Sequence, residues 1–174
     1  MRIALAGAGA FGIKHLDGLA NIGGVTVTAV VSRRLEQAEE VARKYGAGYA
    51  TTDLDEVLAR DDVDAVILCT PTQLHAAQSI AAMRAGKHVQ VEIPVADSWS
   101  DAQEVQRVQQ QTGLVAMVGH TRRFNPSHQW VRRRILAGEL SIQQMDVQTY
   151  FFRDRKSTRL NSSHIQKSRM PSSA

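Results

Sequence analysis

The first 120 residues alternate between two kinds of apolar pattern. Short apolar runs, typical of buried strands, occupy residues 3–6, 25–31, 65–69, 89–91 and 114–118. Between these runs, apolar side chains recur every three or four residues, as they do on one face of a helix. Strands that alternate with helices of this length predict βαβ units. The predicted fold class is therefore α/β, with a Rossmann-type, doubly wound parallel sheet.

Polar residues and glycines mark the ends of the predicted helices. Gly46 is placed to end the helix before it, and Asp53 is placed to cap a short helix. Residues 100–103, Ser-Asp-Ala-Gln, form a predicted capping box for the next long helix. Asn125 and Pro126 supply an N-cap and a first-turn proline for a further helix.

The patterns divide the chain into three parts. Residues 1–122 are the predicted NADP-binding Rossmann domain, and residues 123–153 are the truncated start of an α/β substrate domain. Residues 145–152 predict the first strand of that second domain. Residues 154–174 lack periodicity, and their sequence resembles a translated sequencing-library adapter. We interpret them as a non-native tail, with a natural disordered C-terminus as the alternative, and we expect this truncated chain to be a poor enzyme.

The composition is that of a globular protein: 43% of the residues are hydrophobic and 22% are charged. No apolar run approaches the roughly 18 residues of a transmembrane helix, so no membrane partner is expected. Cys69 is the only cysteine. A disulfide within one chain is therefore impossible, and the reducing cytoplasm is the expected location.

The net charge of +4 does not predict a nucleic-acid partner. Residues 154–174 carry five basic residues and one acid, which leaves sixteen of each sign in residues 1–153. The part of the chain with a predicted fold is therefore neutral, and it lacks the basic excess of a nucleic-acid-binding domain.

The strongest motif is Gly7-x-Gly9-x-x-Gly12, which directly follows the first strand and opens the first helix. This context is that of a dinucleotide-binding loop: Gly7 permits the tight turn, Gly9 admits a pyrophosphate, and Gly12 lets the helix pack on the strand. The helix N-terminus offers N–H donors to the anion. Ala10 and Phe11, between the glycines, complete the predicted cofactor contacts of the loop.

The end of the second strand predicts the choice of dinucleotide. An NAD enzyme commonly carries Asp or Glu there, to accept hydrogen bonds from the ribose hydroxyls. This chain has Ser32, Arg33 and Arg34. Guanidinium groups bind a 2′-phosphate with charge-assisted hydrogen bonds, so NADP is the predicted cofactor. The alternative is that Arg33 and Arg34 only decorate the start of a helix.

Three further motifs follow strands, at the edge of the sheet where ligands bind in such folds. They are residues 69–75 (CTPTQLH), residues 91–94 (VEIP) and residues 119–126 (GHTRRFNP). Together they resemble the glucose–fructose oxidoreductase and inositol dehydrogenase (Gfo/Idh/MocA) family over residues 1–153. Further predicted cofactor contacts are Thr70, Pro71, Thr72, His75, Glu92 and Ile93.

The resemblance implies an NADP-dependent dehydrogenase, and one departure narrows its chemistry. Ile93 stands where the family usually has the lysine of Glu-Lys-Pro, so the usual sugar-type proton transfer is in doubt. The motifs are most similar to a branch that oxidises a cyclic hemiacetal in aromatic-acid breakdown. The family supplies an Asp and a His from beyond residue 153, so the catalytic base stays unassigned. A sugar or cyclitol dehydrogenase and a non-catalytic NADP-binding module remain alternatives, and the parent is expected to be a homo-oligomer.

Arg122 and Arg123 are the predicted contacts of a small carboxylated substrate, since each can form a bidentate pair with a carboxylate. A salt bridge to Glu92 or an anchor at the domain boundary is the alternative.

Two other site classes lack their motifs. No metal site is expected from His75, His88, His120 and His128, which form no i, i+4 pair. No tyrosine is followed four positions later by lysine, which excludes a short-chain dehydrogenase on this chain.

Overall fold

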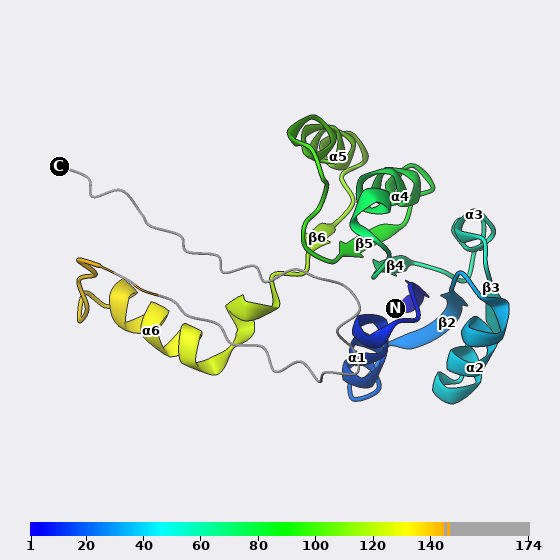
Figure 1. The fold of residues 1–174 in the computed structure, drawn as a ribbon, viewed down its shortest axis with the longest axis horizontal. Coiled ribbons are helices and arrows are strands. Elements are labelled where there is room, and N and C mark those ends of the chain that lie inside the picture. The colour runs from blue at the N-terminus through cyan, green and yellow to red at the C-terminus, as the bar shows by residue number, and fades with distance from the viewer. Residues whose placement is uncertain (145, 147–174) are drawn as a thin grey trace, which may run out of the picture. The chain divides into compact units, whose positions relative to one another are not determined.

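A parallel sheet organises the first part of the chain in the computed structural model, which describes residues 1–144 and 146. The strand order is β3-β2-β1-β4-β5-β6 (Figure 1). The strands are β1 (Arg2–Ala6), β2 (Thr26–Val31), β3 (Tyr49–Thr51), β4 (Ala65–Leu68), β5 (His88–Val91) and β6 (Ala116–Val118). The order reverses between β1 and β4, which is the switch point of a doubly wound sheet. The predicted fold class is confirmed.

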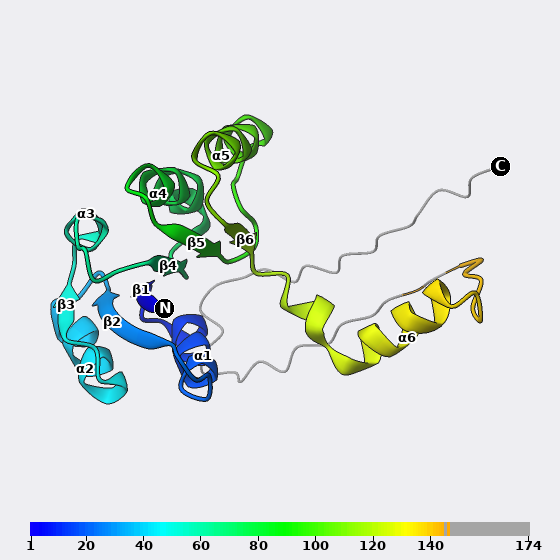
Figure 2. The same ribbon diagram turned by 180° about the vertical axis from the view of Figure 1, so that it is seen from behind.

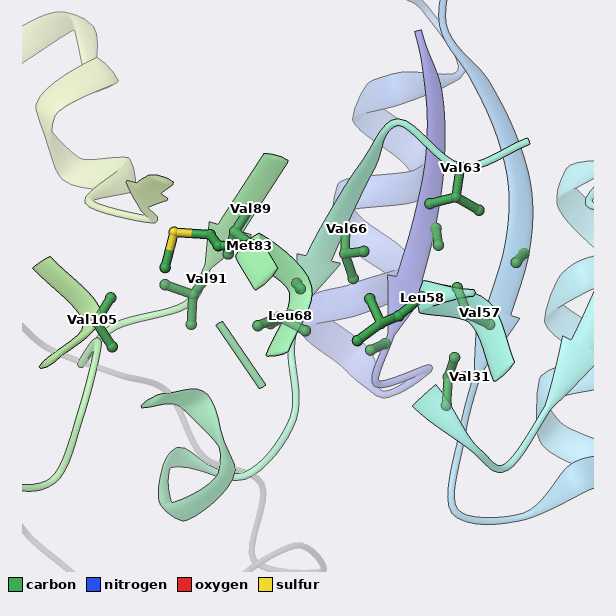
Figure 3. Close-up of a cluster of buried hydrophobic side chains, with 14 of the residues drawn as sticks. Val31, Val57, Leu58, Val63, Val66, Leu68, Met83, Val89, Val91 and Val105 are labelled. Carbon is green, nitrogen blue, oxygen red and sulfur yellow. The ribbon is translucent and has the colours of Figure 1, made fainter. Parts of the chain in front are cut away.

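Helices cover both faces of this sheet (Figure 2). They are α1 (Ala10–Leu19), α2 (Leu35–Tyr45), α3 (Leu54–Leu58), α4 (Thr72–Arg84) and α5 (Trp99–Thr112). Side chains alternate along β1, so Ile3 and Leu5 face α1 and α2, whereas Ala4 and Ala6 belong to the opposite cluster. That opposite cluster, which joins α3, α4 and α5 to the sheet, includes Leu68 and Met83 (Figure 3).

The chain divides into two compact units, the first formed by Met1–Thr121 and the second beginning at Arg122. The described part of the second unit carries the end of a 3-10 helix, η1 (Thr121–Phe124), followed by α6 (Pro126–Leu136). The predicted strand at residues 145–152 and the predicted tail at residues 154–174 lie outside the described residues, apart from Asp146. No helix in the described ranges is long and apolar enough to cross a membrane.

Local capping chemistry explains several helix boundaries. Gly46 ends α2 with a left-handed backbone (φ +74°), and the Asp53 carboxylate accepts from the N–H of Asp55 at the start of α3. Asn125 caps α6 through the N–H of Ser127, with Pro126 in the first turn. These predicted boundaries are confirmed.

The predicted capping box at residues 100–103 is wrong by two residues. The N-cap of α5 is Ser98, whose Oγ accepts from the N–H of Asp101 at 3.0 Å. The same Oγ donates to the Asp101 carboxylate at 2.6 Å. The negative charge of Asp101, in the first turn of α5, also interacts favourably with the positive end of the helix dipole.

Candidate functional site

The glycine loop meets the end of β4 at the carboxyl edge of the sheet. Gly7 has φ +102°, and a Cβ there would lie 2.4 Å from the carbonyl oxygen of Cys69. A Cβ on Gly12 would lie 2.1 Å from the carbonyl oxygen of Gly7, so both positions require glycine. A Cβ on Gly9 would meet nothing within 4 Å. The protein therefore leaves open space at the glycine expected to face a pyrophosphate.

The N-terminus of α1 is arranged to receive an anion. Its N-cap is Gly9, and no side chain caps this terminus. The first N–H groups of the helix can therefore donate hydrogen bonds to a ligand. The positive end of the helix dipole lies at the same terminus. Ala10 and Phe11 are exposed in this first turn, and the ammonium of Lys14 lies 5.5 Å from the centre of the Phe11 ring. The loop fits the phosphates of a dinucleotide.

Ser32 joins the end of β2 to the glycine loop through Gln37. Only 8% of Ser32 is exposed, and its hydroxyl donates to Gln37 Oε1 at 2.9 Å. The Gln37 amide then donates to the carbonyl oxygen of Ala8 at 2.8 Å. The hydroxyl of Ser32 is thus engaged within the protein, whereas Arg33 and Arg34 are exposed beside it. No motif in the sequence marks Gln37.

His75 connects two of the loops at the carboxyl edge. The ring is 2% exposed, with Nδ1 2.7 Å from the carbonyl oxygen of Pro94 and Nε2 2.8 Å from that of Thr70. Both nitrogens are engaged by backbone, so the structure gives His75 the role of joining these loops. Pro71 is exposed at the N-terminus of α4, and Thr72 is the first residue of that helix.

Glu92 lies just after β5, and its partner is a residue that the sequence analysis missed. The Nε2 nitrogen of His15 donates to Glu92 Oε1 at 2.7 Å. A Cβ on Gly119 would lie 2.9 Å from that oxygen, so glycine there leaves room for the carboxylate. His15 follows Gly12 by three residues and therefore lies on the same face of α1, which was an available signal. Ile93, beside Glu92, is 53% exposed.

Cys69 lies beside this pair, immediately after β4. Burial raises the pKa of its thiol to about 12, and the negative charge of Glu92 contributes in the same direction. The ligand-type atoms of His15, Cys69 and Glu92 all lie within 4.8 Å of one another. The thiol is consequently held in its protonated form, next to a carboxylate and an imidazole.

The second unit carries a strongly basic cavity of about 710 Å³. Its lining comes from η1 and α6 and consists of Arg122, Arg123, Phe124, His128, Gln129, Arg132 and Arg133. The predicted substrate contacts Arg122 and Arg123 therefore share a cavity with two further arginines of the same unit. This chemistry suits a ligand with carboxylate groups.

Comparison with known proteins identifies the class. The family described as "Oxidoreductase family, NAD-binding Rossmann fold" (GFO_IDH_MocA) matches residues 1–120. A second family, "Bacterial oxidoreductases, C-terminal", matches residues 126–168. The chain belongs to the first family, which confirms the predicted membership and the NAD(P)-binding class.

Two curated relatives show the range of this family. The chain is 73% identical over 153 residues to 4-carboxy-2-hydroxymuconate-6-semialdehyde dehydrogenase of Sphingobium sp. (strain NBRC 103272 / SYK-6), an alignment covering 88% of this chain and 49% of the relative. It is 35% identical over 141 residues to scyllo-inositol 2-dehydrogenase (NAD(+)) of Bacillus subtilis (strain 168), covering 80% and 41%. The chain thus spans about half the length of these relatives or less.

Solved structures share the fold and include both dinucleotides. One is scyllo-inositol dehydrogenase from Lactobacillus casei with NAD(H) and scyllo-inositol (TM-score 0.77, 26% identity, covering 80% of this chain and 42% of that one). Another is a 3-ketoreductase from Actinomadura kijaniata with TDP-benzene and NADP (TM-score 0.73, 30% identity, covering 79% and 44%). Because the family uses both dinucleotides, the choice between them depends on residues of this chain.

Proposed function

We propose that this chain is the dinucleotide-binding part of an NADP-dependent dehydrogenase. In the proposed reaction, the parent protein oxidises the cyclic hemiacetal of 4-carboxy-2-hydroxymuconate-6-semialdehyde to 2-pyrone-4,6-dicarboxylate. The observation that carries the proposal is the 73% identity to the Sphingobium dehydrogenase, which extends over 153 residues. The single cysteine supports a reducing cytoplasm as its location.

Different residues of this chain bind different parts of the dinucleotide. The loop from Gly7 to Gly12 and the N-terminus of α1 bind the pyrophosphate. Arg33 and Arg34 bind the 2′-phosphate, and none of the residues 32–34, which directly follow β2, is an Asp or Glu that would repel it. When bound, the dinucleotide accepts the hydride of the substrate. Thr70, Pro71, Thr72, Glu92 and Ile93 line the nicotinamide side of the crevice, past the switch point.

Arg122 and Arg123 bind a carboxylate of the substrate. Both belong to the basic cavity of the second unit, and guanidinium groups match the two oxygens of a carboxylate. A substrate with two carboxylates would use such a cavity better than an uncharged cyclitol. The 35% identity to an inositol dehydrogenase keeps a cyclitol as the second candidate substrate.

The proton of the substrate hydroxyl requires a base that Ile93 cannot supply. Glu92 is engaged by His15, and the Cys69 thiol is held protonated. The family resemblance, which implies an Asp and a His from beyond residue 153, supports a base in that part of the parent protein. The chain alone then binds the dinucleotide without efficient turnover.

The full-length parent tests the proposal. Formation of NADPH or NADH is followed with each dinucleotide, first with the hemiacetal substrate and then with scyllo-inositol as the alternative substrate. We expect efficient turnover of the hemiacetal with NADP and little with scyllo-inositol. A kcat/KM for scyllo-inositol equal to or above that for the hemiacetal would overturn the substrate assignment, and turnover by the short chain within tenfold of the parent would overturn the assignment of the base.

A further inference from the structure

Three side chains of metal-ligand type come together from three separate elements. His15 belongs to α1, Cys69 follows β4, and Glu92 follows β5. Their ligand atoms lie within 4.8 Å of one another, and His15 and Glu92 are already in contact at 2.7 Å. Within residues 1–144 and 146, no other such group of three occurs.

This set of atoms suits a borderline or soft divalent ion. Imidazole nitrogen, sulfur and one carboxylate are ligands that Zn²⁺ takes at about 2.0–2.3 Å, often with a fourth position left for water. A tetrahedral ion separates such ligands by roughly 3.3–3.6 Å, so small side-chain shifts would complete the site. Mg²⁺ and Ca²⁺ prefer oxygen ligands and are disfavoured here.

Accessibility and charge are compatible with an ion. The side chains of His15 and Glu92 are 23% and 16% exposed, so an ion can enter while most of its surroundings remain dry. Coordination replaces the thiol proton of Cys69, which is released to solvent, because sulfur binds metals as the thiolate. The two positive charges of the ion then face the two negative charges of the thiolate and the Glu92 carboxylate.

The position of the cluster determines what an ion would do. The Cys69 carbonyl closes against Gly7, the first glycine of the loop that is proposed to bind the pyrophosphate. Dinucleotides enter such sheets at the carboxyl ends of the strands, at the switch point between β1 and β4. An ion held by Cys69 and Glu92 would occupy part of the same crevice.

We propose that His15, Cys69 and Glu92 form a Zn²⁺ site whose occupation excludes the dinucleotide, so that zinc inhibits the enzyme. The metal site itself is independent of the proposed function. The exclusion rests on that function, since it requires that this crevice binds the dinucleotide.

Cobalt tests the site directly. Co²⁺ is titrated into the chain under a non-chelating reductant, and the near-ultraviolet charge-transfer band of a cobalt–thiolate bond is recorded. Cys69 is the only cysteine, so the band has a single source. We expect one Co²⁺ per chain with this band, displaced by Zn²⁺. Saturable binding without the band, or no binding, would overturn the site.

Variants distinguish the proposed metal ligands from a histidine that is not expected to bind the ion. Cys69→Ser and Cys69→Ala should both abolish the band, and His15→Gln should weaken Co²⁺ binding at least tenfold. His120→Gln replaces an exposed histidine of the same unit and should bind as the unmodified chain does. Two cysteine variants are used so that a folding defect in one, detected by circular dichroism, leaves the other to decide. Equal weakening by His15→Gln and His120→Gln would contradict the ligand assignment.

A competition experiment tests the exclusion. With free Zn²⁺ at ten times its Kd, the apparent Kd of NADP should rise about tenfold. The rise should disappear in Cys69→Ser, which also controls for zinc bound by the phosphates of NADP itself. An unchanged Kd at saturating zinc would overturn the exclusion. NADP titration without metal tests the cofactor proposal separately, so the two failures are distinguishable.

Discussion

The imidazole of His15 and the carboxylate of Glu92 meet at 2.7 Å, although 77 positions separate them in the chain. His15 lies on α1, one turn after the glycine loop, and Glu92 follows β5 on the other side of the switch point. The pair therefore connects the two halves of the first unit's fold across the switch point of the sheet. Gly119 leaves the space that the carboxylate occupies.

The first prediction concerns the neighbour of this pair, Cys69. Burial and the charge of Glu92 raise the pKa of its thiol to about 12. Since only the thiolate reacts, alkylation by iodoacetamide at pH 8 should be about a thousandfold slower than that of a free cysteine. The rate should keep rising with pH beyond pH 9, where an ordinary thiol levels off.

Glu92→Gln tests the smaller of the two causes of the raised thiol pKa, which is the negative charge of Glu92. Removing the charge should lower the thiol pKa and speed alkylation severalfold, while burial keeps the rate well below that of free cysteine. Glu39→Gln, an exposed acid on α2, is the control and should leave the rate unchanged. Mass spectrometry measures the modified fraction. Alkylation at the free-cysteine rate at pH 8 would contradict the raised pKa.

The sequence was informative where the chemistry is local. Helix ends at Gly46 and Asp53 follow from residues within one turn, and the glycine loop follows from its position between a strand and a helix. The strand β3 escaped prediction, because its sequence, Tyr-Ala-Thr, is short and lacks the continuous apolar run that marks the other strands. The capping box was misplaced because serines at positions 98 and 100 compete for the same helix start.

Contacts across the fold could not be read from the chain. Gln37 is one of several polar residues in the sequence of α2, and only the folded structure brings it between Ser32 and Ala8. His15 and Glu92 likewise meet only once α1 and β5 are placed on the same sheet edge. Partly buried polar pairs of this kind depend on tertiary packing, which periodicity does not encode.

The second prediction separates two glycines of the loop. Gly9→Ala points a methyl group into open space, so the free energy of unfolding should change by less than about 1 kcal/mol. The same methyl group would stand where the pyrophosphate approaches, so NADP affinity should fall at least tenfold. Gly12→Ala places its methyl group 2.1 Å from a backbone oxygen and should destabilise the fold by about 1–3 kcal/mol or more.

Denaturant unfolding and dinucleotide titration of both variants measure these two effects. The contrast is the critical result, because each variant adds the same single methyl group. Normal NADP binding by Gly9→Ala would show that the ligand does not approach that position. Normal stability of Gly12→Ala would show that α1 packs differently.

The third prediction tests the connection made by His75. His75→Phe keeps a ring of similar size but leaves the carbonyl oxygens of Thr70 and Pro94 without their ring partners. An unsatisfied buried group costs about 1–3 kcal/mol, so the free energy of unfolding should fall by at least about that amount. Leu74→Ala changes an exposed neighbour on α4 and should cost much less. Urea unfolding measures the free energy of unfolding of both variants. Equal losses of stability would contradict the role of His75 in joining the two loops.

The last prediction concerns the choice of dinucleotide. Arg33 and Arg34 are exposed at the end of β2, where the adenosine ribose is proposed to lie, and Ser32 beside them turns its hydroxyl toward Gln37. The arginines are therefore the groups that remain to contact a 2′-phosphate. A hydrogen bond to a charged group contributes about 1.5–3 kcal/mol, which corresponds to roughly a tenfold to hundredfold change in Kd.

The double variant Arg33→Ala/Arg34→Ala should weaken NADP binding by that factor and change NAD binding by less than about twofold, because NAD lacks the phosphate. Arg43→Ala, an exposed arginine in the last turn of α2, is the matched control for a general loss of positive charge. Calorimetric titration of each chain with both dinucleotides needs no turnover, so the short chain suffices. The assignment of NADP requires that the unmodified chain prefer it. Equal or tighter binding of NAD by that chain, or equal losses for both dinucleotides in the double variant, would instead place Arg33 and Arg34 outside the phosphate site.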